Sequence, residues 1–225
     1  MLFRSVSQSR YDIVASPLTV VLAPSIRFTS VALIGVYAES VTVSISDGDS
    51  VVWYEKTEDL RYRETTSWMD FFFGEFENRQ SVYLENLPPI TSANITVTLT
   101  HSSGTVKCGA VVIGTPVDVG DAMAGASVGM VDYSRIDRDE FGNAALIQRK
   151  SIPKTSQTTV LRKEHINKVR KTLNSLRANV ALWVGVEQAT SNYFDSLAVL
   201  GLCTQFDIDL SYKDHALVTL DIQGL

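Results

Sequence analysis

Asn94-Ile-Thr-Val-Thr-Leu-Thr100 alternates apolar and hydroxyl-bearing side chains residue by residue. Successive side chains of a β-strand point to opposite faces of a sheet, so the three apolar residues share one face and the inner threonines share the other. This pattern predicts a strand with one face in a core and one face toward water. It indicates an antiparallel sheet protein rather than a helical one.

Similar short, β-branched segments lie on both sides of this stretch, at residues 19–22, 30–34, 40–45, 50–54, 80–84 and 106–113. Asp47-Gly48 is a strong hairpin signal, because both residue types tolerate positive φ. Pro88-Pro89 marks a loop, since proline cannot donate to a sheet ladder. We therefore predict an N-terminal β-sandwich of jelly-roll or immunoglobulin type over residues 1–114.

Trp68-Met-Asp-Phe-Phe-Phe-Gly-Glu-Phe76 places five aromatic rings in nine residues. Such rings anchor a core or present a binding surface. Three consecutive phenylalanines cannot all face one side of a strand, so we expect a mixture, with some rings in the core and at least one meeting a partner. The candidate interaction surface, which includes a sugar-stacking platform as one interpretation, consists of Trp53, Tyr54, Tyr62, Trp68 and Phe72.

Residues 115–130 carry glycines among alanine, valine and aspartate, without the spacing of a phosphate-binding or dinucleotide-binding loop. We predict that this stretch is a flexible linker between two domains. Residues 131–225 form the second predicted domain. It is an α+β unit with a hairpin over 133–147, strands at 154–161, 180–184, 197–202, 206–210 and 217–222, and one helix.

Ile166, Val169, Leu173 and Leu176 fall on one face of that helix at helical spacing. The opposite face carries basic residues. A solvated face is one interpretation. A subunit contact through Lys163, Lys168, Arg170, Lys171 and Arg177 is the other, with Glu55, Glu58, Asp59 and Glu64 as acidic partners across a ring.

Catalytic motifs for nucleophilic, metal-dependent or phosphate chemistry do not occur in this sequence, so we expect a non-enzyme without a cofactor or metal. The segment starting at Asp137 resembles the start of a calcium loop, but its twelfth position is Gln148, so a hairpin turn is favoured. Cys108 and Cys203 are not spaced like the ligands of a metal site, and we interpret them as inert core residues.

The net charge of −5 disfavours general binding to nucleic acid or anionic membranes. The N-terminus lacks the apolar run of a signal peptide, and the sequence has no apolar stretch of membrane-spanning length. These features predict a soluble protein made in the cytoplasm.

Several segments together resemble a family of tailed-bacteriophage virion proteins. They are the 67–79 run, Leu87-Pro-Pro-Ile90, Cys108–Gly114, Gly125–Arg135 with Asp139–Asn143, and the closing Leu220–Leu225. The resemblance spans most of the chain and rests on structural rather than catalytic motifs.

The resemblance implies a tail component that assembles into a ring around the tail tube or at its tip. The sandwich would be similar to carbohydrate-binding or galactose-binding-like domains, and residues 131–225 would form the ring. Expected partners are further copies of the chain and other tail proteins or fibres, and the expected location is the virion tail. The alternative is a module that binds a host-surface glycan during adsorption.

Overall fold

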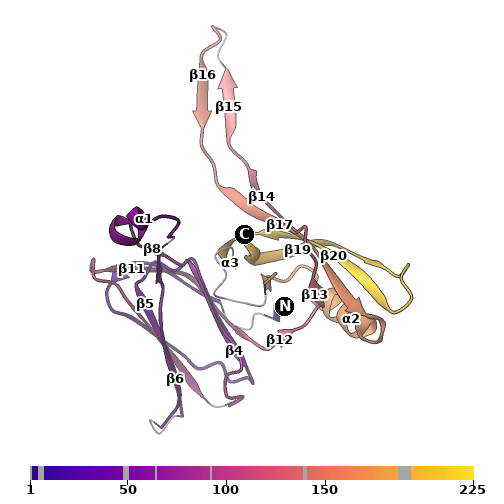
Figure 1. Ribbon diagram of the computed structural model, residues 1–225, viewed down its shortest axis with the longest axis horizontal. Helices are drawn as coiled ribbons and strands as arrows, with labels where there is room; N and C mark the ends of the chain where they lie inside the picture. Colours follow the sequence, from indigo (N-terminus) through magenta and orange to yellow (C-terminus); the bar gives the residue numbers. More distant parts are fainter. Residues whose placement is uncertain are drawn as a thin grey trace. The chain divides into compact units, whose positions relative to one another are not determined.

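The computed structural model of this protein describes residues 2–4, 8–47, 51–63, 65–91, 93–138, 141–186 and 194–225. Strands dominate these residues, and the strand pairs with a determined register are antiparallel. The β-rich fold class predicted from the alternating segments is confirmed. The chain divides into two compact units, residues 3–116 and residues 117–225 with the first two residues (Figure 1).

Within its described residues, the unit of residues 3–116 contains two four-stranded antiparallel sheets. The first sheet holds, in spatial order, β3 (Leu18–Leu22), β10 (Asn94–Thr100), β5 (Ser40–Ser46) and β6 (Val52–Asp59). The second holds β2 (Gln8–Ala15), β11 (Thr105–Gly114), β4 (Ser30–Ile34) and β9 (Ser81–Leu84). The predicted strand segments fall within or overlap these strands, whereas β2 precedes all of them and β6 runs on to Asp59.

The alternating segment 94–100 is the inner strand β10, paired with β3 on one side and β5 on the other. Its apolar residues are buried, while Thr96 and Thr98 are half-exposed, as the alternation predicts. The buried side chains contact a core that includes Phe28, Leu33 and Ile113. Burial of this apolar surface is the main force that stabilises the unit. The predicted turn at Asp47-Gly48 lies partly outside the described residues, although β5 and β6 do pair as a hairpin.

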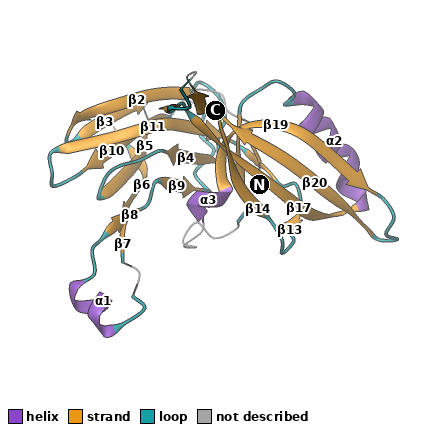
Figure 2. Ribbon diagram, turned by 90° about the horizontal axis from the view of Figure 1, so that it is seen from above, coloured by secondary structure: helices purple, strands orange, loops and turns teal. Residues whose placement is uncertain are grey.

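A short stalk leaves the end of β6. It consists of β7 (Arg61–Tyr62) paired with β8 (Glu77–Asn78), and the segment between them contains the helix α1 (Trp68–Phe73). Figure 2 shows α1 at the end of this stalk. The strand geometry assumed for the three phenylalanines is wrong, because a capping box starts a helix here: Ser67 Oγ accepts from the Asp70 backbone N–H and the Asp70 carboxylate accepts from the Ser67 N–H.

The described part of the second unit is built on one large sheet. In spatial order it holds β12 (Pro116–Val117), β1 (Leu2–Arg4), β18 (Ala181–Val184), β19 (Ala198–Asp209), β20 (His215–Gly224), β17 (Ser151–Arg162) and β13 (Asp121–Ala122), and β14 (Ser127–Asp132) also pairs with β17. Residues 197–202 and 206–210, predicted as two strands, belong mainly to the single strand β19. Its register shifts between Cys203 and Gln205, where a bulge adds a residue without ending the strand.

The predicted helix is present as α2 (Ile166–Ser175), which follows the 3₁₀ turn η1 (Lys163–His165). Val169, Leu173 and Leu176 are buried in the core of the second unit, together with Val218 and Leu220 of β20. The sequence-based prediction of this helix and its apolar face is confirmed. It missed α1 and α3 (Phe194–Leu197), which have six and four residues and are too short to show a helical period.

The stretch 115–130, predicted as a flexible linker, contains β12, β13 and most of β14, and the last two pair with β17. Gly120 has φ +110°, and a Cβ there would lie 2.5 Å from the Val160 carbonyl oxygen. This glycine therefore permits a close approach of two backbones rather than flexibility. The predicted hairpin follows as β15 (Arg135–Arg138) and β16 (Ala144–Ile147), which extend away from the sheet (Figure 1).

Candidate interaction surfaces

An exposed cluster of large apolar side chains covers α1 and the residues after it. We call this cluster the aromatic tip: Trp68, Met69, Phe71, Phe72, Phe73 and Phe76. Every member is more than half exposed, and Trp68 and Phe73 reach 79%. The prediction that some of these rings anchor the sandwich core is wrong, because α1 has no buried residue. The helix places all of the rings outside the core, since the stalk carries them away from the sheets.

The rings of the tip contact one another and one arginine. Trp68 meets Phe71 edge to face with centroids 6.2 Å apart, and Phe71 meets Phe72 in the same way at 5.2 Å. Arg63 supports the tip from the stalk side. Its Nη1 donates to the Phe71 carbonyl oxygen at 2.6 Å, and its guanidinium carbon lies 4.0 Å from the centroid of the Phe76 ring. The tip is thus an ordered surface rather than a loose loop.

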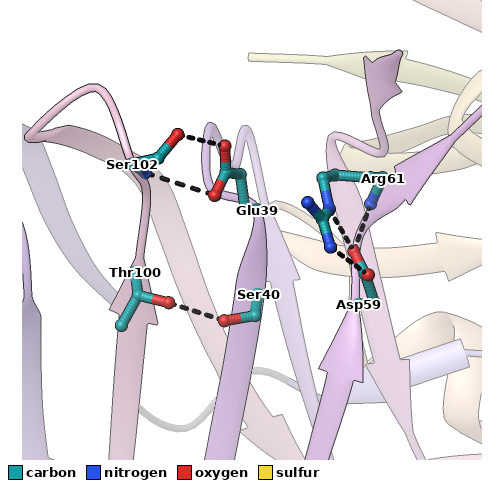
Figure 3. Close-up of polar contacts among 6 residues, drawn as sticks. All are labelled: Glu39, Ser40, Asp59, Arg61, Thr100 and Ser102. Atoms are coloured by element: carbon teal, nitrogen blue, oxygen red, sulfur yellow. Dashed lines mark hydrogen bonds and ion pairs between the residues drawn. The ribbon is translucent and has the colours of Figure 1, made fainter.

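The base of the stalk is fixed by polar contacts that Figure 3 shows. Arg61 donates to both carboxylate oxygens of Asp59, from Nε at 3.0 Å and from Nη2 at 2.8 Å. This charged pair lowers the pKa of Asp59 to about 2. The hydroxyl groups of Ser40 and Thr100, on the neighbouring strands β5 and β10, are hydrogen-bonded at 2.6 Å. Hydrogen bonds donated by Ser102 lower the pKa of Glu39.

The other predicted residues of the interaction surface do not gather at the tip. Trp53 is 58% exposed on the edge strand β6, whereas Tyr54 packs partly against the core. Tyr62 lies in the stalk, where its hydroxyl donates to Glu77 at 2.6 Å. Tyr54 lies near the start of β6, whereas Tyr62 lies beyond its end. The structure joins Trp68 and Phe72 but leaves Trp53 and Tyr54 at the far end of β6.

A second exposed surface lies on η1, α2 and the residues after it. We call it the basic face, and it consists of the predicted residues Lys163, Lys168, Arg170, Lys171 and Arg177. All five are exposed, and among the described residues none of them takes part in an ion pair. Of the proposed acidic partners, Glu58 is paired with Lys56 at 2.6 Å and Asp59 with Arg61. Glu55 is exposed, and Glu64 lies outside the described residues.

A third exposed surface is the hairpin arm, residues 133–138 and 141–149, which was predicted from the sequence as a hairpin but not as a binding surface. Ile136 and Leu146 are direct cross-strand partners and are 58% and 78% exposed. Arg135 and Asp137, on the other face, pair at 2.6 Å. An unsupported two-stranded hairpin is marginally stable in water. The apolar pair in the hairpin pattern was the signal that could have marked this surface.

The second unit also contains a cleft of about 770 Å³, lined by residues 118–126 and by Gln157, Trp183, Leu197 and Leu220 among others. The titratable side chains among its described lining residues are Asp118 and Asp121. Gln157 is buried, and its Nε2 has no hydrogen-bond partner there. Such a wall suits an uncharged or cationic group.

The cysteines match their sequence-based interpretation as unreactive residues. Both are free thiols, Cys108 buried and Cys203 half-buried. Burial raises the pKa of each thiol to about 11, so little reactive thiolate forms near neutral pH. In the described part of the chain, no group of three His, Cys, Asp or Glu side chains is arranged to hold a metal ion. The described helices also include none long and apolar enough to cross a membrane.

Comparison with known proteins leaves the family open. A scan against protein-family models finds no match, and a search of curated protein sequences finds no match either.

Proposed function

We propose that this chain is a non-enzymatic structural protein of a bacteriophage tail, which assembles into a ring and contacts the tail tube, tip or fibres. The exposed hairpin arm is the observation that supports self-assembly. It exposes the apolar pair Ile136 and Leu146 on a two-stranded projection, and among the described residues no third strand or helix pairs with it, although such a hairpin usually needs one. Packing against further copies of the chain would supply that cover. The phage tail assignment rests on the sequence resemblance.

The topology of the N-terminal unit supports a finer assignment of its fold. In sequence order, the first of the eight strands of its two sheets pairs with the last: β2 pairs with β11. The following pairs are nested inside this one, β3 with β10, β4 with β9 and β5 with β6. This is the pairing of one long hairpin. Rolling that hairpin into two sheets gives a jelly roll, and consecutive strands alternate between the sheets except at β5 and β6. We assign the unit as a jelly-roll sandwich domain and residues 117–225 as the ring-forming domain.

The test is the oligomeric state of the purified chain, measured by light scattering and sedimentation velocity, with rings sought by electron microscopy. The wild-type chain is expected to form a closed oligomer of defined mass. The double variant Ile136→Ser, Leu146→Ser is expected to shift to smaller species while its melting temperature stays near that of the wild type, because neither residue belongs to the core of the unit.

The matched control is Val21→Ser, which removes an exposed apolar side chain from the edge strand β3 of the other unit. It is expected to leave the oligomer intact. A wild-type chain that stays monomeric at high concentration would count against the ring. The phage assignment has its own test, because the protein should be located in the tail of purified virions by labelled antibody.

A further inference from the structure

The aromatic tip exposes as much apolar surface as the largest patch of a typical monomer, or more. Its five aromatic side chains and one methionine each expose more than half of their surface. At roughly 150–250 Å² per aromatic side chain, the tip exposes on the order of 500–900 Å² of apolar surface. The largest apolar patch of a typical monomer is about 300–600 Å². A specific protein interface buries about 800 Å² on each partner, so the tip has the size of one half of such an interface.

The charge of the tip restricts what can cover it. Residues 63–79 contain four carboxylates, at positions 64, 70, 75 and 77, and two arginines, at positions 63 and 79, so this segment is net acidic. Anionic lipid headgroups attract basic segments, so an acidic tip does not suit a membrane surface. Exposed rings in an acidic segment instead suit cations, which bind over aromatic faces and are attracted by the carboxylates. Arg63, which lies over the Phe76 ring from the stalk side, is an example of such a contact.

The basic face offers the complementary chemistry. Its five cations are exposed and, in the described part of the chain, have no ion pair. Two of them are arginines, the residue type that stacks most readily on aromatic rings. The helix beneath is fixed by three buried side chains, so the cations are presented on a rigid element. Each chain therefore carries two different surfaces whose chemistry is complementary, one aromatic and net acidic and the other basic.

We propose that the aromatic tip of one copy docks on the basic face of a second copy. The contact is heterologous, with a different surface contributed by each partner, and such contacts repeat around a ring when the rotation closes. This inference rests on the proposed self-assembly and names a contact that makes it. It adds an interface between the N-terminal unit of one copy and the C-terminal unit of the next, separate from the hairpin arm.

The experiment uses two variants with defects on opposite surfaces. The tip variant carries Trp68→Ala and Phe72→Ala, both exposed outside the core. The face variant carries Arg170→Glu and Lys171→Glu, which are exposed on α2. Each variant alone is expected to associate about 30-fold or more weakly than the wild type, as for an interface hot spot. Trp53→Ala and Lys213→Glu are matched controls at exposed positions elsewhere and should associate normally.

An equimolar mixture of the two variants gives the decisive readout. The tip variant keeps an intact basic face and the face variant keeps an intact tip. The tip of the face variant can therefore still dock on the basic face of the tip variant. With Ile136→Ser and Leu146→Ser added to both variants, so that the hairpin arm does not join them, sedimentation velocity should show a mixed dimer that neither variant forms alone. If the wild type assembles but both variants assemble equally well, the docking is refuted and the proposed ring stands. If the mixture fails to associate, or if only the tip variant is impaired, the tip binds something other than the basic face. A monomeric wild type overturns both proposals.

Discussion

Arg63→Ala should release the aromatic tip without unfolding the sandwich. The variant loses the hydrogen bond to the Phe71 carbonyl, worth about 1.5–3 kcal/mol for a charged donor. It also loses the contact with the Phe76 ring, worth about 0.5–1 kcal/mol at an exposed site. Part of this loss is offset, because Arg63 Nε is buried without a hydrogen-bond partner and its removal relieves about 1 kcal/mol. The net cost is about 2 kcal/mol, all of it local to the tip.

Hydrogen exchange at the backbone amides of Phe71 and Gly74 measures this cost. These amides donate to the carbonyl oxygens of Ser67 and Asp70, so they exchange when α1 opens. A loss of 2 kcal/mol corresponds to exchange about 30-fold faster. The melting temperature of the sandwich should change little, since α1 buries no residue in the core.

Arg61→Ala is the control for this experiment. It breaks the exposed ion pair with Asp59 but leaves the contacts of the tip, and an exposed ion pair is worth about 0–1 kcal/mol. Exchange at the two amides should therefore rise only a few-fold. Unchanged exchange in Arg63→Ala, or a fall of the melting temperature like that of a core variant, would refute the view that Arg63 holds a separately folded tip.

Three further predictions concern the sandwich and the sheet. The folded-state pKa of Asp59 lies near 2 and the usual value near 4, so the Arg61 contact contributes stability above about pH 4 that is lost as the pH falls toward 2. The difference in melting temperature between the wild type and Asp59→Asn should shrink over that window, and a constant difference would contradict the assignment. Gly120→Ala should destabilise the chain by about 1–3 kcal/mol in urea unfolding, because φ is +110° and the added Cβ meets a carbonyl oxygen. Gly125→Ala, with φ +108° but open space around it, should cost clearly less, and equal costs would show that the contact does not matter. For the glycan-binding alternative, a glycan array should show binding that Trp53→Ala abolishes with folding retained, and an array without any ligand would remove that alternative.

The sequence predicted well wherever a repeating pattern of side chains met one continuous core. The alternation in residues 94–100 fixed which face of β10 is buried, and the spacing of Val169, Leu173 and Leu176 fixed the face of α2. β10 has seven residues and α2 has ten, and these lengths are enough to distinguish a period of two from a period of 3.6. The basic face followed from the same helix, and it is exposed as predicted.

The sequence predicted poorly where local signals were short. Ser67 and Asp70 carry the capping signature that begins α1, but a helix of six residues shows no period and its aromatic composition suggested a strand. The glycines at 115–130 suggested flexibility, whereas Gly120 is needed where two backbones meet. The sequence shows that a glycine can adopt conformations closed to other residues. Only the position of the neighbouring strand shows which of these conformations is needed, and why.

The sequence by itself determined that this protein is β-rich, that 94–100 is a core strand and that 166–175 is an amphipathic helix, because these features depend on periodicity along the chain. The tertiary structure alone decided that the aromatic residues 68–76 lie outside the core and that the hairpin arm exposes Ile136 against Leu146. Whether an apolar side chain is buried depends on which distant strands cover it. The stalk of β7 and β8 holds α1 away from the strands that could bury its aromatic side chains. The sequence of residues 68–76 alone does not indicate this separation.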